Sequence, residues 1–115
     1  MELVNWKEAP IEWMSDTLGR QLIHTETMTL ARVTLLEGGA VPMHEHENEQ
    51  IVTVLEGRVA FRSDGEERVV EAGSSVPLAA NVPHEVEALA DSVLLDVFSP
   101  RREDWISGDD AYLRR

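Results

Sequence analysis

Residues 38–57 read GGAVPMHEHENEQIVTVLEG, and this stretch decides the fold. It places two histidines, His44 and His46, two positions apart in a segment that we expect to be extended. In an extended strand, residues two apart point to the same face, so both imidazoles are expected on one side. Gln50 follows a short connection and begins a second apolar run, which ends at Gly57. We therefore expect a hairpin that presents two imidazoles and one amide oxygen together.

A third imidazole comes from much farther along the chain. His84 directly follows the turn Asn81-Val82-Pro83, where a new strand is expected to begin. Together with His44, His46 and Gln50 it makes a candidate ligand set for one metal ion, with positions left open for water or substrate. A His-x-His pair alone is more often a surface pair or a satisfied pair in the core than a ligand pair, so the surrounding sequence has to decide.

Short strands separated by turns account for most of the remaining chain. Many short strands at close spacing favour a sandwich or a barrel. Gly65 in the sequence Ser63-Asp64-Gly65-Glu66 predicts a tight hairpin turn, because glycine tolerates a positive φ. A short helix is predicted near residues 101–107 and a helical turn near 11–18. The predicted strands are 21–26, 28–36, 42–46, 50–56, 58–62, 68–71, 75–78, 84–88 and 92–98.

Composition sets the limits on class and partners. A chain of 115 residues is one domain by length, and the absence of cysteine excludes disulfides and thiolate metal sites. The net charge of −12 argues against nucleic acid or an anionic membrane as a partner. Residues 1–10 lack the pattern of a signal peptide and no apolar run is long enough for a membrane helix, so we expect a cytoplasmic protein.

The spacing of these residues resembles that of the cupin superfamily. Gly38-x5-His44-x-His46-x3-Gln50-x6-Gly57 is similar to the first cupin motif, and Gly73-x10-His84 is similar to the second. The resemblance covers about residues 19–105. It implies an all-β, single-domain fold over residues 1–115, a jelly-roll barrel or double-stranded β-helix. The core barrel would span about 19–100, between a short N-terminal extension and a tail at 101–115. It also implies one divalent metal held by His44, His46, Gln50 and His84.

Some positions depart from the usual cupin pattern. Gln50 stands where the first motif usually has glutamate, and Ala79, Asn81 and Ala88 stand where the second usually has proline, glycine and asparagine. Asn81 is a mild change because asparagine tolerates positive φ better than most residues. Gln50 matters more, since a neutral ligand leaves the full positive charge of the metal in place. Such a site favours an anionic substrate.

The end of the chain carries a narrower resemblance. Leu95 to Trp105, LDVFSPRREDW, resembles the tail of the KdgF group of cupins, which open 4,5-unsaturated monouronates to linear keto forms. In that group an aspartate, a phenylalanine and an arginine of this tail line the metal pocket. The matching positions here are Asp96, Phe98 and Arg102. The resemblance thus implies that Asp96 moves protons, Phe98 shapes the sugar slot and Arg102 grips the substrate carboxylate.

Simpler interpretations of these residues remain open. Asp96 also fits a structural acid bonded to backbone amides, Phe98 an ordinary core residue, and Arg102 a surface charge like its neighbour Arg101. His24 has no motif around it and is expected on the pocket wall or the surface. The three tryptophans, which we expect to anchor the terminal segments, are Trp6, Trp13 and Trp105.

The predicted function is therefore metal-assisted isomerisation of a small unsaturated uronate. Imidazole and amide ligands suit zinc, nickel, iron or manganese. Three alternatives stay open: a metal-dependent dioxygenase, a cyclase or lyase acting on another small anion, and a non-enzymatic barrel that binds a small ligand. By analogy with other cupins we expect a homodimer.

Overall fold

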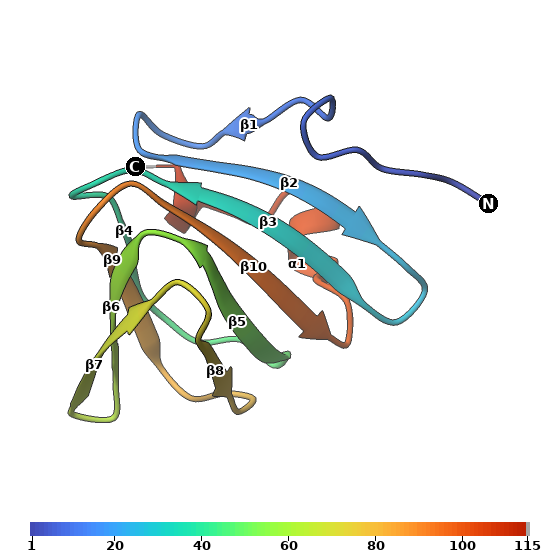
Figure 1. Ribbon diagram of the computed structural model, residues 1–115. Coiled ribbons are helices and arrows are strands. Elements are labelled where there is room, and N and C mark those ends of the chain that lie inside the picture. The colour runs from blue at the N-terminus through green and yellow to red at the C-terminus, as the bar shows by residue number, and fades with distance from the viewer. Residues whose placement is uncertain (115) are drawn as a thin grey trace.

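Two antiparallel sheets face each other in the computed structural model, which describes residues 1–114 (Figure 1). The six-stranded sheet contains, in spatial order, β1 (Glu12–Trp13), β2 (Leu18–His24), β3 (Thr29–Leu35), β10 (Ser92–Ser99), β5 (Glu49–Glu56) and β8 (Ser75–Leu78). The four-stranded sheet contains β4 (Ala40–His44), β9 (His84–Ala88), β6 (Arg58–Ser63) and β7 (Glu66–Glu71). The predicted all-β fold is confirmed by this arrangement.

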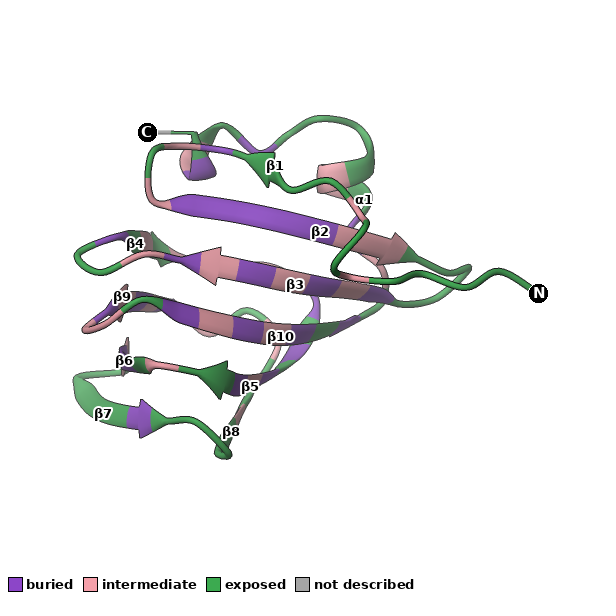
Figure 2. Cartoon of the chain, turned by 45° about the horizontal axis from the view of Figure 1, so that its top comes forward, coloured by how far each residue is buried: buried purple, intermediate pink, exposed green. Residues whose placement is uncertain are grey.

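The core lies between the sheets because the strands alternate apolar and polar residues with a period of two. Figure 2 shows this alternation along β3 and β10 as successive buried and less buried bands. From β10, Leu94 and Phe98 face inward, where both are about 2% exposed. Val93 and Leu95 alternate with them and are more exposed. The inner faces of the two sheets therefore share one apolar core, into which polar groups enter at a few positions.

Turn chemistry agrees with the glycine and asparagine positions of the sequence. Asp64 and Gly65 both have positive φ, 54° and 76°, as a tight hairpin turn between β6 and β7 requires. Gly57 also has positive φ, and a Cβ placed there would lie 2.3 Å from the Ser92 side-chain oxygen. A larger residue at position 57 would therefore push β10 away from the start of β6.

The predicted helical turn near residues 11–18 is wrong. Glu12 and Trp13 instead form β1, and Trp13 pairs with Gly19 of β2. A Cβ at Gly19 would lie 2.6 Å from the Ile11 side chain, so the glycine lets this segment lie close against the sheet. Edge pairing with β2 outweighs the weak helical pattern, because a single helical turn makes too few hydrogen bonds to hold itself.

The C-terminal tail folds back over one end of the barrel. It contains α1 (Glu103–Ile106), which confirms the helix predicted near 101–107, and η1 (Ala111–Leu113). Asn48 fastens the start of the tail by donating hydrogen bonds to the carbonyls of Pro100 and Arg101, at 2.5 and 3.2 Å. The last residue of the predicted tail, Arg115, lies outside the described residues. Within residues 1–114, no helix has the length and apolarity needed to cross a membrane.

Candidate metal centre and its cavity

Three histidines meet at one end of the barrel. His44 of β4 is the direct cross-strand partner of His84 at the start of β9, and their ring centres are 4.3 Å apart. His46 lies just beyond the end of β4, and its ring centre is 5.5 Å from that of His44 and 5.1 Å from that of His84. One ligand nitrogen from each ring can be chosen so that all three lie within 4.8 Å of one another. The structure thus brings together the predicted imidazoles, although the strand ends at His44 rather than His46.

Backbone carbonyls fix the orientation of all three rings. The Nδ1 atoms of His44, His46 and His84 lie 2.7, 3.0 and 2.9 Å from the carbonyl oxygens of Pro42, Asn48 and Val82, in that order. A carbonyl only accepts, so each Nδ1 must carry the proton and donate it. Each Nε2 is then left with a free lone pair. Histidines that bind a metal through one ring nitrogen usually donate the N–H of the other to a carbonyl or a carboxylate in this way.

Burial keeps these rings neutral. It is the main reason why the pKa values of His44 and His46 are lowered to about 4, and it also lowers the pKa of His84. Neighbouring cationic groups, Arg102 among them, act in the same direction. A neutral imidazole is the form that donates a lone pair to a metal, so the cluster is ready to bind at neutral pH.

Gln50 completes the cluster from the opposite sheet. Its Oε1 lies 3.1 Å from Nε2 of His46. With the His46 proton on Nδ1, both of these atoms are hydrogen-bond acceptors, and two acceptors at this separation repel unless a cation or a proton lies between them. The lowered pKa of His46 argues against a proton at neutral pH.

The residues present therefore fit a divalent metal. Nε2 of His84 is buried and has no hydrogen-bond partner among the described residues, which is costly for a polar atom unless a ligand is bound. Three imidazoles and an amide oxygen, in a chain without cysteine, suit zinc, nickel, iron or manganese. The exposed His24 is bonded to Thr29 instead and takes no part in the cluster.

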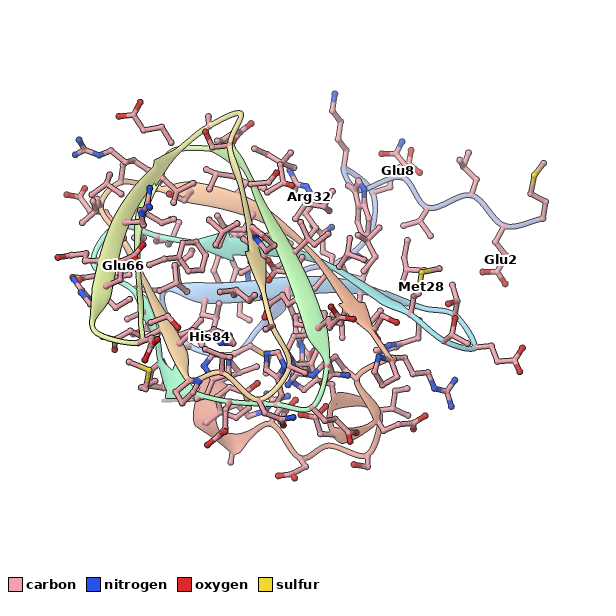
Figure 3. All side chains as sticks on the ribbon, turned by 90° about the horizontal axis from the view of Figure 1, so that it is seen from below. Glu2, Glu8, Met28, Arg32, Glu66 and His84 are labelled. Atoms are coloured by element: carbon pink, nitrogen blue, oxygen red, sulfur yellow. The ribbon has the colours of Figure 1, made fainter. Side chains whose placement is uncertain are left out.

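A cavity of about 50 Å³, partly open to solvent, adjoins this cluster between the two sheets. Figure 3, seen from below, marks His84, a member of the cluster, inside the outline of the molecule, while Glu2, Glu8 and Glu66 lie at the periphery. The walls are largely apolar, and the polar side chains among them are few. These polar lining residues are Arg20, His44, Gln50, His84, Asp96, Arg102 and Tyr112.

Asp96 is the carboxylate of this cavity. It lies in the middle of β10, between Ala31 of β3 and Val52 of β5, and it faces inward like Phe98. Burial raises the pKa of Asp96 to about 7, while Gln50 and Arg102 act in the other direction. Its Oδ1 is buried without a hydrogen-bond partner in the described part of the chain. A carboxyl group of this kind is poised to exchange a proton near neutral pH.

Arg102 is buried and reaches the cavity from the tail. Its Nε and Nη2 bind Asp104 at 3.0 and 2.8 Å, and Nη2 also donates to the Tyr112 hydroxyl at 3.0 Å. Its guanidinium carbon lies 4.0 Å from the ring centre of Trp105 and 4.8 Å from that of Phe98. Asp104 occupies Nε and Nη2, the edge of the guanidinium group that can make two parallel hydrogen bonds. Nη1 is therefore the nitrogen left to bind a ligand.

Sequence reasoning did not single out two polar residues of the cavity wall. Arg20 occupies an inward position of β2, and Tyr112 comes from η1, with its ring centre 5.1 Å from that of His44. The alternation Leu18, Arg20, Leu22 in a strand is the signal that would have placed Arg20 inside. Tyr112 has no comparable signal, because only the fold of the tail brings it to the histidines.

Comparison with known proteins identifies the family. The cupin domain model matches residues 31–98, which include all four candidate ligands and Asp96. The chain belongs to the cupin family. This cupin is 30% identical over 102 residues to the pectin degradation protein KdgF of Dickeya dadantii, an alignment that covers 86% of this chain and 93% of the relative.

Solved structures agree with this assignment. KdgF from Halomonas sp. superposes with a TM-score of 0.86 and 27% identity, covering 90% of this cupin and 99% of that chain. An RmlC-like cupin from Shewanella frigidimarina also gives a TM-score of 0.86, with 26% identity over 91% of this chain and 96% of the other. The resemblance to the KdgF group that the tail indicated is thus found over most of the chain.

Proposed function

We propose that this cupin is a metal-dependent isomerase that opens a small 4,5-unsaturated monouronate to its linear keto form. The observation that carries the proposal is the position of Asp96, an inward carboxyl group with an unpartnered oxygen, in the same cavity as the histidine cluster. The similarity to KdgF, a pectin degradation protein by name, supports a uronate as substrate. The reaction moves a proton from oxygen to carbon and needs no oxidant.

Asp96 would carry the proton in this reaction. Opening of the sugar ring removes a proton from the anomeric hydroxyl and breaks the bond between the anomeric carbon and the ring oxygen, which leaves an aldehyde and an enolate. The enolate becomes a ketone when its carbon takes up a proton. A carboxyl group whose pKa lies near 7 can serve both as the base and as the acid. Such a role typically accelerates a reaction by about 10² to 10⁴.

The remaining roles concern binding. Arg102 would attract the substrate carboxylate through its charge and through Nη1, rather than through the two-pronged edge that Asp104 occupies. Phe98, with Trp105 edge-on at 5.2 Å, would form the apolar wall of the sugar slot. His44, His46, Gln50 and His84 would hold the metal, which when bound supplies Lewis-acid stabilisation of negative charge on a substrate oxygen. We retain the cytoplasm as the proposed compartment.

The decisive experiment is an assay of the metal-loaded protein with unsaturated galacturonate and unsaturated mannuronate. The wild type should consume at least one of them without oxygen uptake. Asp96→Asn keeps the size of the side chain but cannot exchange a proton, so kcat should fall by about 10² or more while metal content stays unchanged. Normal turnover by Asp96→Asn, or no turnover by the wild type, would contradict the proposal. Oxygen consumption would point to a dioxygenase, and binding without turnover to a ligand-binding barrel.

We also propose that the protein is a homodimer that buries the outer face of the six-stranded sheet. Strand register aligns a row of apolar residues across this face, and Ile51 and Val97 in it are 52% and 39% exposed. The row consists of Ile23, Leu30, Val97, Ile51 and Pro77. Burying such a row favours association. Light scattering should give a dimeric mass for the wild type and a monomeric mass for Val97→Glu; a monomeric wild type would contradict the proposal.

A further inference from the structure

A second arginine reaches the cavity, from the six-stranded sheet rather than from the tail. Arg20 of β2 is only 5% exposed, and it lines the same cavity as His44, His84 and Asp96. Its Nε donates to Glu12 at 2.8 Å and its Nη2 to Asp110 at 2.5 Å. Its Nη1 is buried and has no hydrogen-bond partner in residues 1–114. Two N–H groups of a charged side chain are therefore left without an acceptor.

The two carboxylates around Arg20 are matched by a second arginine, so they leave no excess negative charge to repel an anion. Glu12 and Asp110 are shared with Arg114, which contacts them at 3.1 and 3.0 Å. Two guanidinium groups face two carboxylates, so this network is neutral as a whole. Both bonds of Arg20 are made from the Nε–Nη2 edge, which leaves Nη1 on the other side of the group. A buried charged donor without a partner costs free energy that a ligand oxygen would recover.

Trp105 holds the two cavity arginines in one assembly. The guanidinium carbons of Arg20 and Arg102 lie 5.1 and 4.0 Å from the centre of its indole ring. Arg102 likewise makes its hydrogen bonds through Nε and Nη2 and none through Nη1 with the residues described. Each arginine thus has one nitrogen free, and both arginines are fixed before a ligand arrives. Such preorganised donors lose little entropy on binding.

We propose that Arg20 is a ligand-binding residue of this cavity, and that its Nη1 donates to an oxygen of a small carboxylate ligand. The inference rests on the proposed function for the kind of ligand, an acidic sugar. It adds that recognition of the negative charge is divided between Arg20 and Arg102. Arg20 acts on binding and carries no proton in the reaction, so its loss weakens binding and leaves the chemical step intact.

The test compares galacturonate with galactose, which differ in the carboxylate. Calorimetric titration of the full-length, metal-loaded protein should show tighter binding of galacturonate. Arg20→Gln should reduce this preference by at least about tenfold, as expected for the loss of a hydrogen bond to a charged group. Arg114→Gln is the matched control, because Arg114 shares Glu12 and Asp110 but does not line the cavity. It changes the charge of the network by the same one unit as Arg20→Gln, so its effect on the preference should be clearly smaller.

Arg20→Lys covers the case in which Arg20→Gln does not fold. Lysine keeps a positive charge beside Asp110 but has a single side-chain nitrogen, so nothing replaces Nη1. The same loss of preference for galacturonate is therefore expected. Equal losses in the Arg20 and Arg114 variants would show that the network is structural only. Retention of the preference by a folded Arg20 variant, or no preference in the wild type, would also overturn the inference.

Turnover separates this inference from the proposed function. If the wild type converts unsaturated uronates and Arg20→Gln leaves KM unchanged, Arg20 is not a binding residue but the proposed function stands. If no unsaturated uronate is converted and only the Arg20 variants lose galacturonate binding, the proposed function fails and the assignment of Arg20 stands. If the proposed function and the assignment of Arg20 are both correct, Arg20→Gln will raise KM by at least about tenfold with kcat little changed.

Discussion

Single residues in this protein are oriented by partners that the motif itself supplies. His44 and His84 belong to different motifs and lie 40 positions apart in the sequence, yet they are direct cross-strand partners. Their Nδ1 atoms donate hydrogen bonds to the carbonyls of Pro42 and Val82, each two residues before the histidine. The same local geometry thus repeats in both motifs. A mutation that changes the backbone at Pro42 or Val82 should therefore reorient the imidazole of the following histidine without replacing it.

Loss of one ligand provides the first prediction at this scale. His84→Ala removes an imidazole that is 2% exposed and whose Nε2 has no partner in the region described. Metal affinity should fall by at least about tenfold, since removal of even an outer partner typically costs 10- to 100-fold. His24→Ala is the control, because His24 lies outside the cluster. Metal analysis after gel filtration measures the effect, and equal metal loss in both variants would count against the assigned site.

At the scale of elements, the tail does more than end the chain. α1 and η1 bring Trp105 and Tyr112 to the cavity, and Asp110 pairs with Arg20 of β2. Trp105 was expected to anchor a terminal segment, and it also forms part of the cavity wall. The tail is therefore both a structural cover for one end of the barrel and a source of residues for the site.

Arg102→Lys tests this double role. Lysine keeps the charge but loses the paired contact with Asp104, the bond to Tyr112 and the stacking on Trp105. We expect a loss of roughly 1–3 kcal/mol in the free energy of unfolding, together with a higher KM. Arg101→Lys is the control, since Arg101 forms an exposed pair with Glu103 and should change neither value. Urea unfolding and steady-state kinetics measure both effects. A wild-type unfolding midpoint for Arg102→Lys would show that the tail is held by other contacts.

For the molecule as a whole, the buried titratable groups set the pH dependence of stability. In the metal-free protein His44 and His46 stay neutral down to about pH 4, whereas in the unfolded chain they take up protons near their ordinary pKa of 6.5. The unfolded chain binds more protons in this window, so stability is lost as the pH falls from about 6.5 to 4. Asp96 acts oppositely, because its folded pKa of about 7 lies above the ordinary 3.8. Its burial costs more stability as the pH rises through this range.

The metal-free wild type should therefore become less stable on acidification, with Asp96 reducing the effect. Asp96→Asn removes that opposing contribution, so its stability should fall more steeply between pH 7 and 4. It should also be more stable than the wild type at pH 7.5. Urea midpoints of chelator-treated protein across this range provide the measurement. Parallel curves for the two proteins would show that Asp96 has an ordinary pKa when folded.

The sequence by itself determined the class of fold and the histidine cluster. Alternating apolar residues predicted strands at 75–78 and 84–88 with the bounds that the structure has. Asn81 and Gly65 marked turns correctly, because a positive φ is a local property. Strand geometry predicted that His44 and His46 face the same side, and the resemblance to the two cupin motifs implied that His84 joins them.

Only the tertiary structure decided which polar groups share the cavity and which of their atoms are free. Arg20 lies far from Trp105 and Tyr112 in the sequence, and the three line one cavity because the tail folds back over the barrel. The pairing of Arg102 with Asp104 is local, but its effect on ligand binding depends on which nitrogen faces the cavity. Such contacts depend on the relative placement of whole elements, which is set by packing between the sheets and the tail. Short-range periodicity carries no information about that placement, so the sequence predicted the histidine cluster but not the complete wall of the cavity.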